Sequence, residues 1–499
     1  MNGLSKEEKK LRLRPIEENF SFFAKISVLF GMIYPFCLYR NPFGVTYPLF
    51  VLFSCICFLA ACQKLSVPIK KGSWFLLAVA MLLGISTFLT ADPFLHFFNK
   101  LALILLGAVL ALHQFYNDKS WNIGKYSVAI FLYFWHSLIA LPWPLVHALR
   151  HRKEGGARNW QLLLLPAAGL MVAFPVCLLL ILILCQADAV FSSMMWWFLK
   201  HAFSPFALAH ITVMLVFGIF APYCLICSCC LRKIPETTPN RQALPPAMAE
   251  AFIGAIGFVY LLFCAVQIFY LFLGKGSLPE GYTYSSYARR GFFQLLLVAF
   301  FNLALVLCCL KYVRPRTCLR LLLTLVTACT YVLIASAAYR MALYVNEYHL
   351  SYLRILVLWF LALLFVLMLG VARIIWKPEF PLFWFFVATV SVFYVSLSLA
   401  RPDAIIARSY VARLDPATAT ESQFRYLTEG LCADAAPAVA TLGLDLEELR
   451  QRSGNHTGKG WAWRISRQPG RSRLNPRAYP DGVRSYNYSV ETARRLFGQ

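Results

Sequence analysis

The sequence is poor in charge, and especially in negative charge. Charged residues fill only 14% of its 499 positions, and Asp and Glu number 23 against 47 Lys and Arg. Soluble domains have about 25% charged and about 45–50% apolar residues, whereas 60% of this chain is hydrophobic. The composition therefore excludes an ordinary soluble domain and favours a protein that lies mostly in lipid.

Motifs of catalysis and metal binding are also lacking. The nine histidines include no HExxH pair, and the chain has no G-x-S-x-G nucleophile elbow. Residues 454–460 imitate a phosphate-binding loop but lack the Ser or Thr after the lysine. The 16 cysteines lie in or beside apolar runs, and one cluster lacks the longer second spacing of a zinc site: Cys224, Cys227, Cys229 and Cys230. We therefore expect no metal, no cofactor and no disulfide framework, and the sequence favours a protein that is not an enzyme.

Long apolar runs recur between Phe20 and Ala400, and a helix needs roughly 20 such residues to cross about 30 Å of hydrocarbon. Backbone amides in lipid must pair within their own segment, and these runs lack the period of two of a transmembrane barrel. We therefore predict an all-α fold, a polytopic transmembrane helical bundle with 11–12 spans. The candidate spans are residues 20–39, 45–62, 73–90, 101–116 (short for a crossing), 126–147, 160–186, 206–230, 251–273, 292–310, 319–338, 354–375 and 380–400.

The net charge of +24 does not require nucleic acid as a partner. Lys and Arg gather in short connectors, as topology-setting charges do, and the most basic are residues 150–158, 232–241, 311–320 and 373–377. Twelve crossings put these four on one side, the cytoplasmic one, but put the basic N-terminus and residues 64–71 on the other. If one segment between residues 73 and 147 does not cross, eleven spans remain and the N-terminus lies inside. We expect a bacterial cytoplasmic (inner) membrane protein with an extracytoplasmic C-terminal region.

The chain divides into a charged N-terminal tail (1–19), the bundle (20–400) and two C-terminal segments. Residues 401–449 contain four Arg against eight acids, and their apolar spacing predicts helices over 420–431 and 435–442, with Asp434 as an N-cap. We expect this segment to be a small water-facing helical module. Residues 450–499 contain eleven Lys or Arg against two acids, and we expect them to be largely irregular. Membrane lipids, and an envelope protein partner contacting residues 401–499, are the expected partners.

Several motifs run through the second half of the chain: ADAVF before Ser192, VQIFYLF from Val266, LPEG from Leu278, YARRGF from Tyr287, SAAYRM from Ser336, PDAIIAR from Pro402 and YLTEGLCADAAP from Tyr426. Together they resemble a bacterial membrane family known as domain of unknown function 4173, over about residues 160–445. The resemblance implies a multi-pass membrane protein, and no enzymatic motif defines that family. Gln294 and Ser409 depart from the family pattern, where we expect an acid and a Tyr.

Polar side chains that are candidates for a ligand or lipid-headgroup site gather around the connector within residues 266–307. Arginines there can bind a phosphate or extend to the interface, and tyrosines suit an interface belt. The candidates are Arg289, Arg290, Tyr287, Glu280, Arg340, Asp188 and Gln267. A re-entry loop with an aromatic belt is an alternative explanation for the residues of the connector. For Arg340, pairing with Glu280 or Asp188 and anchoring at the membrane interface are equally good explanations.

The expected spans hold few polar residues near their middle: His136, His210, Gln267, Gln294 and Asn302. Hydrogen bonds between helices explain amides of this kind. Every acid from Asp92 to Glu379 lies at or near a span end, whereas an ion-coupled transporter usually keeps a carboxylate in mid-membrane. Asp403 and Asp434 are candidate catalytic carboxylates, for which helix capping and pairing with Arg are simpler explanations.

The sequence therefore favours an uncharacterised, non-enzymatic integral membrane protein with a sensing, scaffolding or envelope-regulatory role. A transporter or flippase for a small molecule or lipid is the alternative, and it requires arginines such as Arg340 to reach a polar cavity between helices. An intramembrane enzyme acting on a lipid-linked substrate is the third hypothesis.

Overall fold

The long apolar runs form the long helices of the molecule, and the computed structural model is helical throughout the part of the chain that it describes. That part comprises residues 6–41, 43–118, 121–154, scattered positions within 173–194, 205–231, 234–235, 244–268, 284–314, 316–454, 460–465, 479 and 482–497. An isolated bridge joins Leu244 to Val313, and these described ranges contain no strand. The predicted all-α polytopic bundle is confirmed.

Ten helices in the described residues are long and apolar enough to cross a membrane. Most of their ends lie within a few residues of the predicted ones. They are α2 (Phe20–Leu38), α3 (Thr46–Lys64), α4 (Lys71–Leu89), α5 (Pro93–Phe115), α10 (Pro205–Leu231), α11 (Pro246–Gln267), α12 (Tyr284–Tyr312), α13 (Thr317–Tyr348), α14 (Tyr352–Trp376) and α15 (Leu382–Ala400).

The helix expected over residues 101–116 begins earlier than predicted. α5 starts at Pro93 because Asp92 accepts a hydrogen bond from the Phe94 amide at 2.8 Å and so caps the helix. The resulting 23 residues are enough for a crossing. The predicted start was wrong because polar residues such as His96 occupy the first turns of α5, and this polar pattern is typical of a connector.

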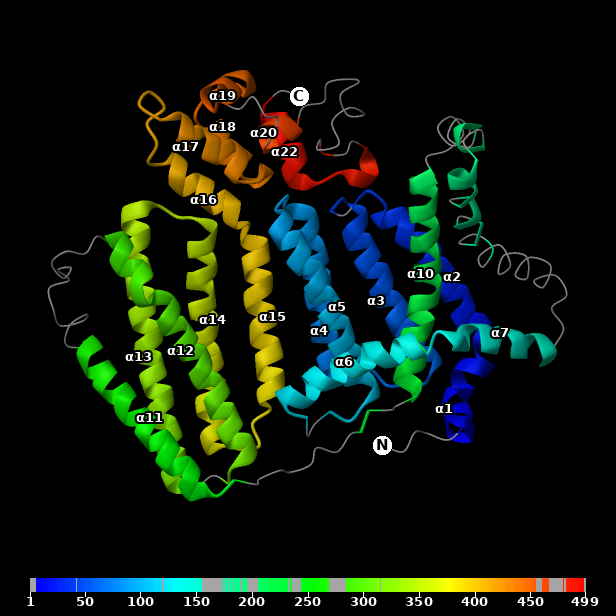
Figure 1. Ribbon diagram of the computed structural model, residues 1–499, viewed down its shortest axis with the longest axis horizontal. Helices are drawn as coiled ribbons and strands as arrows, with labels where there is room; N and C mark the ends of the chain where they lie inside the picture. The colour runs from blue at the N-terminus through cyan, green and yellow to red at the C-terminus, as the bar shows by residue number, and fades with distance from the viewer. Residues whose placement is uncertain are drawn as a thin grey trace.

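Two shorter helices take the place of the span expected over residues 126–147. α6 (Ile123–Ile139) and α7 (Pro142–Glu154) form a pair bent by 47°, and they run across one end of the bundle (Figure 1). Proline lacks an N–H and cannot continue the preceding helix, so Pro142 starts a new one. The span expected over residues 160–186 lies almost wholly outside the described residues.

The spanning helices pack as two halves that α15 joins. The core of one half comes from α11 to α14 and includes Ile253 and Met368, and the core of the other includes Leu76 of α4. α15 packs on both α14 and α4 (Figure 1), where Val395 lies against Leu83. The C-terminal end of α15, at Ala400, therefore lies where the two halves meet.

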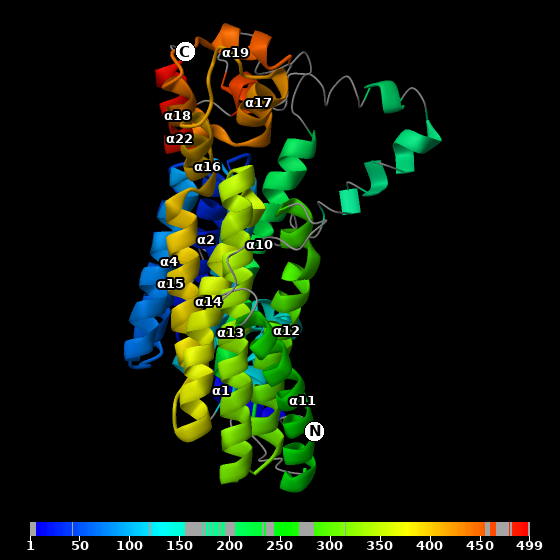
Figure 2. The same cartoon turned by 90° about the vertical axis from the view of Figure 1, so that its left-hand side faces the viewer.

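Short connectors that hold Lys and Arg gather at one end of the bundle, here called the basic end. α1 (Lys6–Glu18) lies at one end, together with the α3–α4, α12–α13 and α14–α15 connectors, which hold Lys70, Arg316 and Lys377 (Figure 1). The C-terminal helices lie at the opposite end (Figures 1 and 2). Because α6 and α7 run across the bundle, the basic N-terminal tail falls at the same end as the other basic connectors.

Residues 402–497, here called the C-terminal module, fold around one core in their described part. Its elements are α16 (Pro402–Val411), α17 (Glu421–Arg425), the π-helix η2 (Tyr426–Gly430), the 3₁₀ turn η3 (Ala433–Ala435), α18 (Ala436–Ala440), α19 (Leu446–Arg452), α20 (Trp461–Arg464), η4 (Val483–Ser485) and α22 (Tyr488–Leu496). The helical character expected of residues 401–449 is present. The segment 450–499, expected to be largely irregular, contributes α20 and α22, because Trp461 and Val490 are buried with Phe424 and Val439 in the same core.

Candidate functional site

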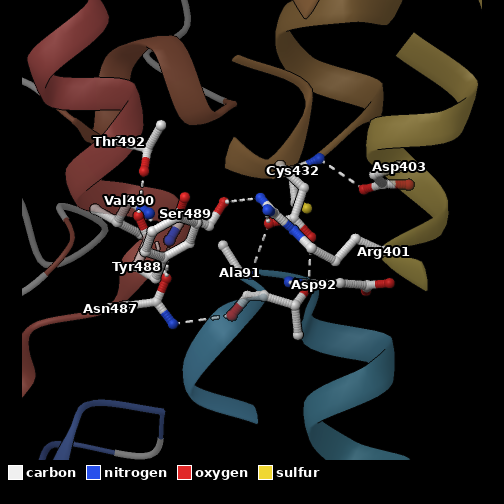
Figure 3. A network of polar contacts seen from close by, with 12 residues as sticks. Ala91, Asp92, Arg401, Asp403, Cys432, Asn487, Tyr488, Ser489, Val490 and Thr492 are labelled. Carbon is white, nitrogen blue, oxygen red and sulfur yellow. Dashed lines mark hydrogen bonds and ion pairs between the residues drawn. The ribbon is translucent and has the colours of Figure 1, made fainter. Parts of the chain in front are cut away.

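The C-terminal module meets the bundle at a buried polar cluster, here called the module–bundle junction (Figure 3). The bundle contributes the α4–α5 turn, where Thr90 ends α4 and Asp92 caps α5. One oxygen of Asp92 caps the helix, and the other accepts a 2.7 Å hydrogen bond from the hydroxyl of Tyr352 at the start of α14. Asp92 thus ties the tip of α4–α5 to the other half of the bundle.

Arg401 is the covalent link between α15 and the module. Its backbone is left-handed, with φ of 52° and ψ of 74°, a conformation that costs a residue with a side chain about 1–2 kcal/mol. Pro402 then starts α16 at once. The guanidinium turns into the junction, where Nη2 donates to Asp434 at 3.0 Å and to Ser489 at 3.3 Å and the group lies over the Tyr488 ring.

Asp434 is the module's main contact with the bundle. Its carboxylate accepts hydrogen bonds from the Thr90 hydroxyl, from the Ala91 amide at 3.2 Å and from Arg401. The predicted role of Asp434 as an N-cap was wrong, because η3 precedes α18 and Ala435 takes the cap position. Pairing with arginine, the simpler explanation for Asp434, is observed.

Asp403 is the third buried carboxylate of the junction. It lies in the first turn of α16 and accepts a 2.8 Å hydrogen bond from the Cys432 amide. Burial raises the pKa of Asp403 to about 6, although this hydrogen bond opposes the shift, and the charges of Asp92 and Asp434 add to it. Burial also raises the pKa of Asp92, against hydrogen bonds from Tyr352 and the α5 backbone.

Asn487 closes the junction from the last helix. Its Oδ1 caps α22 by accepting from two backbone amides. Its Nδ2 faces the carbonyl oxygens of Phe88 at 2.8 Å, Thr90 at 2.9 Å and Phe43 at 3.2 Å. One side chain therefore holds α22 against the α4–α5 turn and the α2–α3 turn.

A polar chain continues from the junction into the membrane-spanning region. Asn99 of α5 donates to Thr87 of α4 at 2.9 Å and accepts from Tyr394 and Ser398 of α15 at 2.8 and 3.0 Å. Ser398 also bonds Ser86 of α4 at 2.5 Å. Sequence reasoning missed Asn99 because it placed this stretch in a connector. The positions 92, 96 and 99 share one face of a helix, and this spacing is the signal that identifies the cluster.

The structure brings two of the seven predicted site residues together. Gln267 of α11 accepts from Ser336 at 2.7 Å and from Arg340 at 3.2 Å, both on α13. Gln267 is buried and Arg340 half-buried. Pairing of Arg340 with Glu280 or Asp188 stays a prediction, since Glu280 lies outside the described residues and Asp188 is exposed.

The remaining predicted site residues are placed only in part. Tyr287, Arg289 and Arg290 lie in the first turns of α12, and their side chains are outside the described part of the structure. Among the mid-span amides, Asn302 bonds Thr330 at 2.9 Å and Tyr260 at 2.7 Å across helices, as expected for such a residue. Gln294 is exposed at the start of its apolar segment.

Several cysteine and histidine side chains that could suggest a metal site pack or form hydrogen bonds within the described residues. Three members of the predicted cysteine cluster, Cys224, Cys227 and Cys229, are buried in the apolar cores. His147 and His151 are four residues apart on α7, but His147 bonds the Tyr223 hydroxyl at 2.7 Å and His151 lies against Phe20. Within the described ranges, no three His, Cys, Asp or Glu side chains are placed to hold a metal ion.

A fourth buried carboxylate, Asp118, lies at the basic end. Asp118 accepts hydrogen bonds from His113 at 2.7 Å and from Tyr126, and Lys70 lies 3.8 Å away. Burial opposes ionisation, but these partners together lower the pKa of Asp118. The group fastens the α5–α6 connector to the end of α5.

This architecture defines the class: a multi-pass helical membrane protein with a helical module docked on one end. The chain belongs to the family described as Domain of unknown function (DUF4153), which matches residues 77–442. That family is also one of unknown function, but its number differs from the 4173 that the motifs indicated. The matched region runs from within α4 to the end of α18 and includes Asp92, Arg401, Asp403 and Asp434. No curated protein and no solved structure matches the chain.

Proposed function

We propose that this protein is a non-enzymatic membrane sensor or scaffold, in which the C-terminal module passes its docked or released state to α4, α5, α14 and α15. One observation carries this proposal: Asp434 of the module contacts Thr90 and Ala91 at the α4–α5 turn and Arg401 at the end of α15. The same junction reaches α14 through Asp92.

The energetics of the junction favour two discrete states over gradual loosening. Removing one partner of a buried ion pair costs about 3–5 kcal/mol, because the other charge is left buried without compensation. Asp434 has no exposed side-chain surface, and Arg401 keeps 21% of its own. Release of the module must therefore break the Arg401–Asp434 pair and the Thr90 bond together, and hydration of the freed carboxylate favours complete separation.

The charge distribution supports an orientation for the proposed sensor. The basic end, with α1 and the Lys- and Arg-bearing connectors, faces the cytoplasm in our proposal, because positive connectors remain inside. The module then lies on the extracytoplasmic side, where an envelope protein is the expected partner. Membrane lipids surround the apolar faces of the bundle.

Coupling between module and helices is testable with a cross-link inside the bundle, one helical turn from Arg401. Ser86 and Ser398 bring their hydroxyls within 2.5 Å between α4 and α15, so the double variant S86C/S398C should form a disulfide in oxidised membranes, identified by mass spectrometry of linked peptides. Adding Asp434→Ala should release the module, seen as increased proteolysis of residues 402–497, and should lower the yield of the cross-link severalfold.

The matched control is Asp445→Asn, since Asp445 caps α19 in the same module, away from the junction, and Asn caps a helix equally well. This variant should leave both proteolysis and cross-link yield unchanged. A released module with an unchanged cross-link yield would contradict coupling. A module that stays protected after Asp434→Ala would contradict the role given to the junction.

Transport is the second candidate, and one contact favours it. Arg340 is half-buried inside the bundle and bonds Gln267, in agreement with the requirement that an arginine lie between helices. Replacing Arg340 by Met should abolish uptake or lipid flipping if this site carries a substrate, while Arg354→Met, at the start of α14, serves as the control. Equal behaviour of the two variants would remove this candidate.

A further inference from the structure

The module–bundle junction holds more negative than positive charge. Three carboxylates from three different elements meet there, and they are almost completely buried, with 4% exposure for Asp92, 6% for Asp403 and 1% for Asp434. One of them, Asp434, is paired with Arg401. Asp92 and Asp403 are held by neutral donors instead, namely the Tyr352 hydroxyl and backbone amides.

The groups described as acting on Asp403 are acidic or neutral, and a further cation, Arg354 of α14, acts on the neighbouring Tyr426. Asp92 faces it from the start of α5 and Tyr352 from α14, and Tyr426, Cys432 and Asp434 face it from the module. His96, one turn into α5, has its Nε2 2.9 Å from the Thr90 carbonyl oxygen. Closing this interface brings like charges together in a region that water does not reach, and such repulsion disfavours two adjacent ionised carboxylates.

The geometry also supplies a hinge. The chain enters the module through Arg401, whose left-handed backbone joins two helices without an intervening loop. A rotation at this residue would separate Asp403 and Asp434 from Asp92, and it would also uncover Ala91, which is buried in the module core. The interface, the hinge and the unbalanced charges therefore lie within the same few residues.

We propose that the junction is an acid-responsive switch: Asp403, assisted by Asp92, takes up a proton on mild acidification, and the module then docks more tightly on α4–α5. This inference rests on the proposed function and adds the condition that changes the docked state. It also fits a module on the extracytoplasmic side, where pH varies.

The direction of the pH effect follows from proton linkage. The pKa of Asp403 is about 6 in the docked structure, and a carboxyl released into water returns to about 3.9. The docked state therefore binds more protons between these values, so docking is strongest below about pH 4 and weakens as pH rises through about 6. Between about pH 7.5 and pH 5 this single group favours docking by about tenfold on acidification.

The experiment measures amide hydrogen exchange of residues 427–440 in the full-length protein in detergent, at pH 5 and pH 7.5, with rates corrected for the intrinsic effect of pH. The chain should exchange about tenfold more slowly at pH 5. Asp403→Asn carries the shape of the protonated side chain without its charge, so most of the difference between its corrected rates at the two pH values should be lost. Asp92→Asn should reduce the ratio of the exchange rates at the two pH values in part. It provides the test if Asp403→Asn does not fold.

Asp445→Asn removes a carboxylate of the same module outside the junction and should keep the tenfold ratio. A ratio of one in the parent chain, faster exchange at pH 5, or a full ratio in Asp403→Asn would each overturn the switch. Calcium or a chelator should leave the rates unchanged, and an effect of either would assign the cluster to a metal instead. The cross-link between positions 86 and 398 is read at a single pH, so the coupling and the switch fail independently.

Discussion

Asp434 accepts a hydrogen bond from the hydroxyl of Thr90, a residue 344 positions earlier in the chain. This contact joins the last segment of the protein to the tip of its third and fourth spanning helices. The same carboxylate binds Arg401, the residue at which the chain leaves the membrane region. The module is therefore held at both its covalent and its non-covalent connection by a single side chain.

Replacement of Asp434 by Ala should destabilise the docked module by about 3–5 kcal/mol, because Arg401 is left without its partner. Protease sensitivity of the module in membranes measures this effect. Replacing both residues, as in Arg401→Met with Asp434→Leu, should cost less than the sum of the single changes, with a coupling of about 0.5–3 kcal/mol. Additive effects would show that the pair contributes nothing as a pair.

Asn487→Ala should also release α22 from the bundle. It removes a helix cap worth about 0.5–2 kcal/mol, and it leaves the carbonyl oxygens of Phe88 and Thr90 without their donor. Asn122 provides the matched control, because it caps α6 at the opposite end and accepts from Lys125. Asn122→Ala should leave the module protected from protease, and equal effects of the two variants would argue against the junction.

Trp461→Ala should unfold the module while sparing the bundle. The indole is buried in the module core and its N–H donates to the Leu427 carbonyl at 2.9 Å, and truncating a buried Trp costs about 3–5 kcal/mol. Trp74→Ala, at an exposed position on α4, is the control. Circular dichroism should retain the signal of the long helices in both, while exchange protection of residues 427–440 should be lost in the first. If residues 427–440 stay protected from exchange in Trp461→Ala, then residues 450–499 do not contribute to the module core.

The spanning helices were predictable because apolar length alone specifies them, as α14 and α15 show. The start of α5 was not, since a cap at Asp92 followed by Pro93 overrides the polar character of its first turns. The break at Pro142 was not predictable from hydropathy either, because hydropathy describes how apolar a segment is and not how it packs. Charge counting left open that one segment between residues 73 and 147 does not cross, and the bent pair of α6 and α7, which is either a broken span or a re-entrant segment, lies there.

The candidate site was harder to predict than the fold. Gln267 and Arg340 were selected by their unusual place in an apolar run, and they do meet. The junction was missed because its members are distant in sequence: Asp92, Arg401 and Asp434 each have an adequate local explanation as a cap or interface charge. Only the folded arrangement shows that Asp434 leaves its expected cap position to bind another helix.

The sidedness of the module tests the central claim most directly. Glu447 has a side chain that is 70% exposed on α19, and Lys71 is exposed at the basic end. We expect Glu447→Cys to react with a membrane-impermeant maleimide in intact cells, above the labelling of the parent chain, and Lys71→Cys to react only after the membrane is opened. Labelling of both positions from the same side, or of Glu447→Cys only in opened cells, would contradict the account.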